Sequence, residues 1–115
     1  MAFISSHTLN GVDGTHASDI LVTLTRLGEK APLFTTRMDS AGRLSQEVDI
    51  ADSDPAMIYE LVFATAPYWL TRNLPTENNQ IIFDIVLRFR MPDPYGKYHM
   101  PIILSPNSYS TWASS

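Results

Sequence analysis

The sequence predicts an all-β protein, an antiparallel β-sandwich that carries one short helix. Short runs of β-forming residues, separated by turn-forming residues such as Gly, Pro and Asn, recur along the whole chain of 115 residues. The run at residues 81–90, IIFDIVLRFR, has the clearest period of two, as expected for a half-buried strand. About seven runs of this kind are present, and strands at this spacing are typical of a sandwich.

Three strands are predicted in the N-terminal half. The second shows the alternation best, because Val22 and Leu24 share one face while threonines occupy the other. A loop at residues 10–14 (NGVDG) follows the first strand, and a turn at residues 39–43 (DSAGR) follows the third, with Gly42 at its tightest point. The three strands are residues 2–9 (AFISSHTL), 19–27 (DILVTLTRL) and 32–38 (PLFTTRM).

Four strands are predicted in the C-terminal half. Tyr59 and Phe63 face one way in the first of them, and Phe83 is expected to share a face with Ile85 in the second. The four strands are residues 57–65 (MIYELVFAT), 81–90 (IIFDIVLRFR), 98–105 (YHMPIILS) and 108–112 (SYSTW).

One segment breaks the β pattern. Residues 65–73 (TAPYWLTRN) begin with Thr65 as an N-cap candidate and place Pro67 in the first turn, where proline is favoured. A single short helix between two strands is therefore expected.

Composition excludes several classes of protein. The net charge of -4 argues against a general nucleic-acid binder, which needs a basic surface. The absence of cysteine excludes disulfides, thiolate zinc sites and cysteine nucleophiles. No apolar stretch approaches the roughly 20 residues of a membrane-spanning helix, and the N-terminus shows no secretory signal. An intracellular, soluble protein is expected.

Three side chains are candidates for chemistry. His7 and His99 lie on predicted strands, and a histidine held on a strand is well placed to accept or donate a proton near neutral pH. Arg43 follows the tight turn, where its guanidinium can bind a carboxylate or a polarised carbonyl. For each residue taken alone, an ordinary solvated surface position is the alternative.

Other sites receive no support from the sequence. His16 has no supporting pattern and is expected to be a surface residue. The spacings of 9 residues from His7 to His16 and of 83 from His16 to His99 match no metal-ligand motif, so no metal site is predicted. No G-x-S-x-G motif of serine hydrolases is present.

The C-terminal stretch, YHMPIILSPNSYSTWASS, resembles the signature of the transthyretin-like family, whose enzymatic branch consists of 5-hydroxyisourate hydrolases. In that branch the stretch typically runs Tyr-His-Val-Pro-Leu-Leu-Leu-Ser-Pro and closes on Tyr-Ser-Thr-Tyr-Arg-Gly-Ser. ISSHTLN is similar to the first-strand motif Thr-His-Val-Leu-Asp, and DSAGRL is similar to the Asp-Gly-Arg turn. IYELVFATAPYW and IIFDIVLRFRMPD resemble two further family segments, so the resemblance spans nearly the whole chain.

The resemblance implies a fold and an assembly. It implies a single transthyretin-like domain over residues 1–115, with two four-stranded sheets and one short helix. It also implies a homotetramer, a dimer of dimers, whose sites lie in a channel at the dimer–dimer interface. The expected partner is a small-molecule substrate, without nucleic acid or membrane.

The resemblance also implies an activity and a set of site residues. The family's histidine, arginine and histidine fall on His7, Arg43 and His99, a set that the hormone carrier transthyretin lacks. The expected reaction is hydrolysis of 5-hydroxyisourate in urate breakdown, without metal or organic cofactor. Trp112 and Ser115 are expected to shape the substrate pocket, and the cytoplasm is the expected location, with the peroxisome as an alternative.

The tail departs from the family pattern, because Ala113 replaces the arginine of Tyr-Arg-Gly-Ser. If that arginine orients the substrate, its loss removes a charge-assisted contact of about 1.5–3 kcal/mol, about ten- to a hundredfold in affinity or rate. Two alternatives to the hydrolase therefore remain open. One is a repurposed relative acting on another heterocyclic metabolite, and the other is a carrier that binds a small ligand in the same channel.

Overall fold

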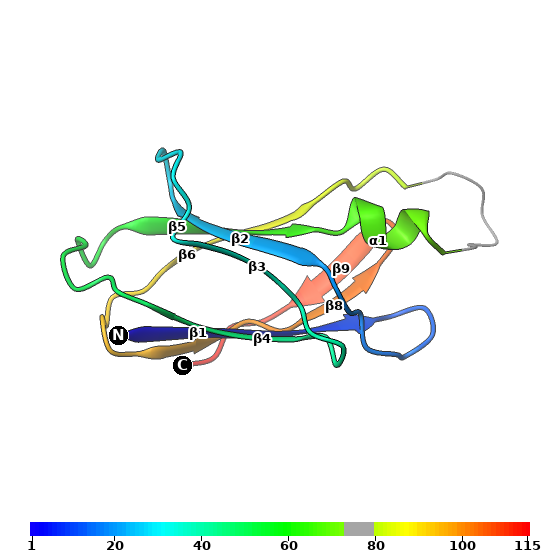
Figure 1. Ribbon diagram of the computed structural model, residues 1–115, viewed down its shortest axis with the longest axis horizontal. Coiled ribbons are helices and arrows are strands. Elements are labelled where there is room, and N and C mark those ends of the chain that lie inside the picture. The colour runs from blue at the N-terminus through cyan, green and yellow to red at the C-terminus, as the bar shows by residue number, and fades with distance from the viewer. Residues whose placement is uncertain (73–79) are drawn as a thin grey trace.

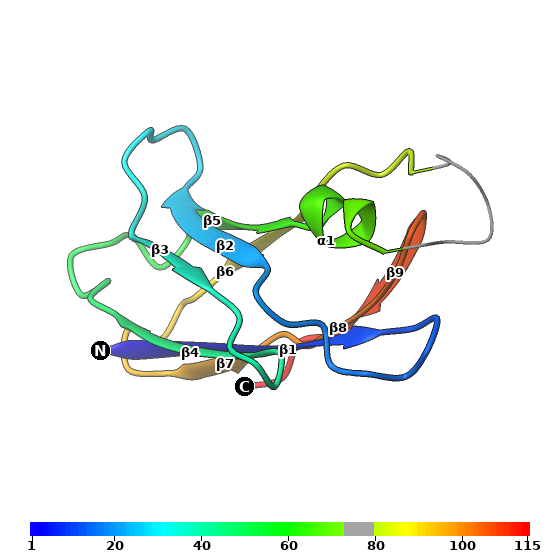
Figure 2. The same ribbon diagram turned by 45° about the vertical axis from the view of Figure 1, so that its right-hand side comes forward.

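Two β-sheets packed face to face form the molecule, and one short helix lies at the end of the second sheet (Figures 1 and 2). The computed structural model describes residues 1–72 and 80–115. The first sheet contains β1 (Ala2–Asn10), β4 (Arg43–Val48), β7 (Lys97–His99), β8 (Ile102–Ser105) and β9 (Ser108–Thr111). The second sheet contains β2 (Leu21–Arg26), β3 (Phe34–Arg37), β5 (Ile58–Ala64) and β6 (Ile85–Arg90), and α1 (Ala66–Leu70) follows β5. The predicted sandwich is confirmed.

The first sheet has four strand positions although it contains five strands. β7 and β8 both pair in parallel with β1, with Ser5 opposite His99 and Thr8 opposite Ile102. The two pairings share one register, so β7 and β8 lie end to end along the same edge of β1. Pro101, which has no N–H to donate, lies between them and interrupts the strand predicted at residues 98–105.

β1 separates core residues from surface residues by strict alternation. Its even-numbered residues, from Ala2 to Asn10, are buried between the sheets, whereas its odd-numbered residues are only half-buried. On the opposite sheet, the side chains of Val22, Leu24 and Phe63 are completely buried in the same core. Burial of each such side chain stabilises the fold by about 1.5–3 kcal/mol.

Two further sequence expectations, besides the strand interrupted at Pro101, differ from the structure. Residues 43–48, RLSQEV, form β4 although no strand was predicted there, because the polar Gln46 occupies an inward position between Leu44 and Val48 and breaks the apolar alternation. Phe83 lies before β6 rather than within it and is 70% exposed, so it does not share the buried face of Ile85.

The helix forms where it was expected but is shorter. Pro67 lies in its first turn, while Thr65 makes no side-chain capping bond and instead donates from Oγ1 to the carbonyl of Phe83 at 3.4 Å. α1 ends at Leu70, and Asn73, the last residue of the predicted segment, lies outside the described residues. No helix in the described part of the chain is long and apolar enough to cross a membrane.

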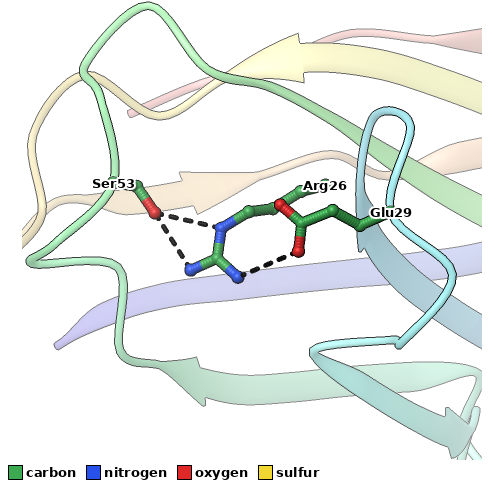
Figure 3. A network of polar contacts seen from close by, with 3 residues as sticks. All are labelled: Arg26, Glu29 and Ser53. Carbon is green, nitrogen blue, oxygen red and sulfur yellow. Dashed lines mark hydrogen bonds and ion pairs between the residues drawn. The ribbon is translucent and has the colours of Figure 1, made fainter.

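A polar network ties a loop to the end of β2 (Figure 3). Arg26 donates from Nε and from a terminal nitrogen to the Ser53 hydroxyl, at 3.1 and 3.0 Å. Its other terminal nitrogen lies 3.8 Å from the Glu29 carboxylate. The connection between β4 and β5, which crosses from the first sheet to the second, is thereby fixed to β2 of the second sheet, at the end of the molecule that also contains the N-terminus.

Gly42 and Gly28 provide a matched test of the turn that precedes β4. Both have positive φ, but a Cβ on Gly42 would lie 2.5 Å from the backbone oxygen of Thr8, whereas a Cβ on Gly28 would meet nothing within 4 Å. We expect Gly28→Ala to lower the free energy of unfolding by about 1 kcal/mol, because only backbone strain is added. Gly42→Ala should lower it by roughly 3 kcal/mol, because the turn must also move away from β1. Urea denaturation measures both changes; equal losses would contradict the close packing of the turn on Thr8.

Candidate functional site

The outer face of the first sheet gathers the predicted site residues. His7 on β1 lies directly opposite Arg43 on β4, and Ser5 lies opposite both Ser45 on β4 and His99 on β7. Residues directly opposite each other point to the same side of a sheet. The odd-numbered residues of β1 are the outward ones, so His7, Arg43 and His99 share the outer face in two adjacent rows.

The turn before β4 presents Arg43 to this face. Asp39 accepts hydrogen bonds at Oδ1 from the backbone N–H groups of Ala41 and Arg43, both at 2.9 Å. The Gly42 carbonyl accepts the Thr8 N–H at 2.7 Å, which fixes the turn to β1. The Arg43 guanidinium is exposed and makes no ion pair within the described residues, so it is available to an anionic or polarised group.

His7 is held by its Nε2 atom. This nitrogen lies 3.1 Å from the carbonyl oxygen of Ala41, and because a carbonyl only accepts, we assign the ring proton to Nε2. In the neutral ring Nδ1 is then the basic nitrogen. Burial lowers the pKa of His7 below its ordinary value, and the positive charges of Arg43, His16 and His99 lower it further, while the Ala41 carbonyl raises it. His7 is therefore unprotonated at neutral pH, as a general base must be.

His99 lies on β7, along the opposite edge of β1 from β4, and is held by Ser5 of β1. Its Nδ1 lies 2.7 Å from the Ser5 hydroxyl, a hydrogen bond in which the tautomer decides the donor. Within the described residues no hydrogen bond occupies its Nε2 atom, which leaves one ring nitrogen for a ligand. The backbone of His99 exchanges two hydrogen bonds with Ser114, both 2.9 Å, so the C-terminal tail lies along β7.

The tail continues the register of β9. Ile102 lies opposite Thr111 and His99 opposite Ser114, so the same register places Trp112 opposite Pro101, in the row of His7. Trp112 is 51% exposed. Alternation puts the side chain of Ala113 on the opposite face of the sheet from Trp112 and Ser114. Ser114 is bonded to His99 through the backbone, and Ser115, which is expected to shape the substrate pocket, follows it in the chain.

The structure adds His16, which the sequence placed at the surface without a role. His16 is exposed, but its Nδ1 lies 3.0 Å from Nε2 of His7, and the two ring centroids are 5.1 Å apart. The loop predicted at residues 10–14 turns the chain back so that His16 pairs with Leu9. The predicted loop was the only signal in the sequence that could have placed His16 beside His7. A spacing of nine residues does not by itself indicate a contact, because the contact depends on where the loop ends.

Two pockets are candidates for ligand binding. A shallow pocket of about 270 Å³ is lined by Arg43 and His99 together with Ser5, Asp39 and Ser45. A larger pocket of about 400 Å³ lies beside α1, and none of the three histidines lines it. We assign the site to the smaller pocket, because Arg43 and His99 line it. His7 does not line this pocket but lies directly opposite Arg43, on the same face of the sheet.

No metal-binding group of three or more His, Cys, Asp or Glu side chains exists within residues 1–72 and 80–115. The two imidazoles of His7 and His16 are in contact, but within the described residues no third side chain of these types completes a metal site with them.

Comparison with known proteins places these features in context. The model of the HIUase/Transthyretin family matches residues 4–113. The 5-hydroxyisourate hydrolase of Ralstonia nicotianae is 30% identical over 117 aligned residues, which cover both chains completely. The 5-hydroxyisourate hydrolase of Pseudomonas aeruginosa is also 30% identical and covers all of this chain and 93% of its own.

Solved structures share the fold. The 5-hydroxyisourate hydrolase of Klebsiella pneumoniae superposes with a TM-score of 0.76, 24% sequence identity and complete coverage of both chains. Transthyretin from Sparus aurata superposes with a TM-score of 0.78 at 23% identity, covering 96% of this chain and 95% of its own. The same sandwich is therefore present in a hydrolase and in a transthyretin.

The charge of Arg43 should be visible in the titration of His7. Arg43→Gln removes a positive charge beside the imidazole, so the pKa of His7 should rise toward its ordinary value and the ring should protonate at a higher pH. NMR titration of the ring signals measures this shift. Arg37→Gln is the matched control, since Arg37 lies on β3 of the other sheet and binds Asp19. A His7 titration that is identical in both variants would contradict the assigned electrostatics.

Proposed function

Because the chain belongs to the HIUase/Transthyretin family, we propose that it is an enzyme that hydrolyses 5-hydroxyisourate. The product of this lactam ring opening is 2-oxo-4-hydroxy-4-carboxy-5-ureidoimidazoline, and the proposed pathway is urate degradation. The observation that carries the proposal is the convergence of His7, Arg43 and His99 on one outer face beside a pocket. The full-length similarity to proteins named 5-hydroxyisourate hydrolase supports it.

His7 is the proposed general base. Its lowered pKa keeps the imidazole unprotonated at neutral pH, and Nδ1 is the nitrogen without a bond to the described residues. It accepts a proton from the water molecule whose oxygen attacks the lactam carbonyl carbon. General-base assistance of this kind contributes typically 10²–10⁴-fold.

Arg43 and His99 complete the proposed reaction. As the carbon becomes tetrahedral, negative charge develops on the carbonyl oxygen, and the unpaired guanidinium of Arg43 stabilises it. The carbon–nitrogen bond of the lactam then breaks, and His99, oriented by Ser5 through Nδ1, donates a proton to the departing nitrogen from Nε2. His7 ends with one proton more and His99 with one fewer, and exchange with solvent restores both. Water is the only other reactant, so the proposed mechanism uses no metal and no organic cofactor.

We propose a homotetramer in which two such faces meet. The outer face carries partly exposed apolar side chains, Ile103 at 39% and Trp112 at 51%, and contact with another subunit would cover them. A facing subunit would also close the shallow pocket, with Trp112 as part of its wall. Ser115 follows the last paired residue of the tail, Ser114, so pairing does not fix its direction, and it is proposed as a second part of this wall. The cytoplasm is the proposed location.

Loss of either histidine should abolish turnover. We expect His7→Ala and His99→Ala each to lower kcat/KM for freshly generated 5-hydroxyisourate by about 10²- to 10⁴-fold, because a proton-transfer group is removed. The ultraviolet decay of the substrate measures the rate, and sedimentation velocity checks that each variant keeps the assembly of the parent. Thr35→Ala, an exposed change on β3 of the other sheet, is the control with an unchanged rate. A parent protein no faster than buffer at micromolar concentration would refute the proposal and favour a carrier.

Restoring the family arginine tests the role of Ala113. Because the register directs this side chain away from the face that carries His99, we expect Ala113→Arg to change kcat/KM by less than about threefold. Ser114→Arg is the matched comparison on the outer face, where a cation beside His99 should alter the rate more strongly. A ten- to a hundredfold gain from Ala113→Arg would instead show that the missing arginine limits activity.

A further inference from the structure

His16 is placed beside His7 by the backbone rather than by its own side chain. It pairs with Leu9 in an isolated bridge, and the neighbouring Ala17 donates its N–H to the Thr8 carbonyl at 2.9 Å. The buried Thr8 hydroxyl donates in turn to the Ala17 carbonyl at 2.6 Å. These bonds hold the segment after the loop against β1, on the same edge that β4 occupies further along.

The loop before His16 is ordered by its own hydrogen bonds. Asn10 accepts at Oδ1 from the N–H groups of Val12 and Asp13, at 2.8 and 3.2 Å, and donates from Nδ2 to the Tyr68 hydroxyl at 3.0 Å. Asp13 accepts from the backbone and the hydroxyl of Thr15, at 2.9 and 2.6 Å. No bond in this set uses the imidazole of His16, and the hydrogen-bond partner of this ring among the described residues is His7.

The contact between the two rings has a direction. Nε2 of His7 carries the proton and donates it to the Ala41 carbonyl. Nδ1 of His16, 3.0 Å away, is then a second acceptor of the same N–H, in a bifurcated hydrogen bond. Two acceptors on one N–H fix both the orientation of the ring and the position of its proton. The other groups that face His7 are the guanidinium of Arg43 and the imidazole of His99, while the Asp39 carboxylate is engaged by the turn.

We propose that His16 is a positioning residue for His7, holding the ring with Nε2 protonated so that Nδ1 stays free to accept a proton. The expected effect of His16 on kcat rests on the proposed function, because it assumes that His7 acts as a general base in hydrolysis. The positioning itself is a property of the two rings and can be observed without substrate.

Two variants separate the parts of this role. His16→Ala removes the acceptor and the charge, whereas His16→Asn keeps a polar group near the place of Nδ1 but cannot become charged. We expect His16→Ala to lower kcat about two- to tenfold with KM within twofold, as for the loss of one hydrogen bond. His16→Asn should return kcat to within twofold of the parent. In both variants the fall of activity on the acid side should move to higher pH, because a positive charge beside His7 is lost.

Ring ¹⁵N spectra provide the readout that needs no turnover. The parent should show His7 protonated at Nε2 at neutral pH. His16→Ala should show a mixture of His7 tautomers and a His7 titration moved to higher pH, and His16→Asn should retain the Nε2 proton of His7. Val12→Ala, an exposed change in the same loop, should resemble the parent in every measurement.

The outcomes distinguish this inference from the proposed function. A His7 tautomer and titration that His16→Ala leaves unchanged would overturn the inference, whatever the activity. Altered spectra in a protein without hydrolase activity would support the positioning and overturn the proposed function. Thermal melting of each variant confirms that the fold is intact before either conclusion is drawn.

Discussion

A single register along β1 is the constraint on which the rest of the structure depends. β4 pairs with one edge of this strand, β7 and β8 pair with the other, and the tail extends the pattern through β9. Because side chains alternate with a period of two, a slip of one residue would move His7 into the core and a buried neighbour to the surface. The core therefore specifies the site. Ile4 and Thr8 fit only between the sheets, and their burial determines where His7 points.

The site combines rigid backbone with groups that have unused hydrogen-bonding capacity. Turn and loop bonds to Thr8 hold the segments on either side of His7, and the tail is bonded to His99. Each imidazole is bonded to the described residues through one nitrogen, Nε2 of His7 to Ala41 and His16 and Nδ1 of His99 to Ser5, and the other nitrogen of each ring is left for a ligand. A hydrogen bond to one ring nitrogen orients an imidazole and leaves the other nitrogen able to accept or donate a proton.

Much of the fold was predictable because hydrophobic alternation records it directly. The strands around Val22 and Phe63 were identified from their period, and the short helix from Pro67. β4 was missed because the polar Gln46 lies at an inward position and interrupts its apolar alternation. Phe83 was misplaced because the alternation in the sequence starts before the first paired residue of β6, Ile85.

For the site, His7, Arg43 and His99 came from family resemblance, and their placement on one face requires the register. The contact of His16 depends on how a five-residue loop closes, which local sequence does not specify.

The division of β1 into a buried side and an open side also bears on how such proteins diverge. Along β1 the side chains that build the core alternate with the outward side chains, such as His7, so a substitution on the outer face need not disturb folding. A lineage can therefore exchange one binding chemistry for another in small steps, each of which leaves a folded and inheritable protein. The sandwich then persists while its outer face becomes the variable part of the molecule.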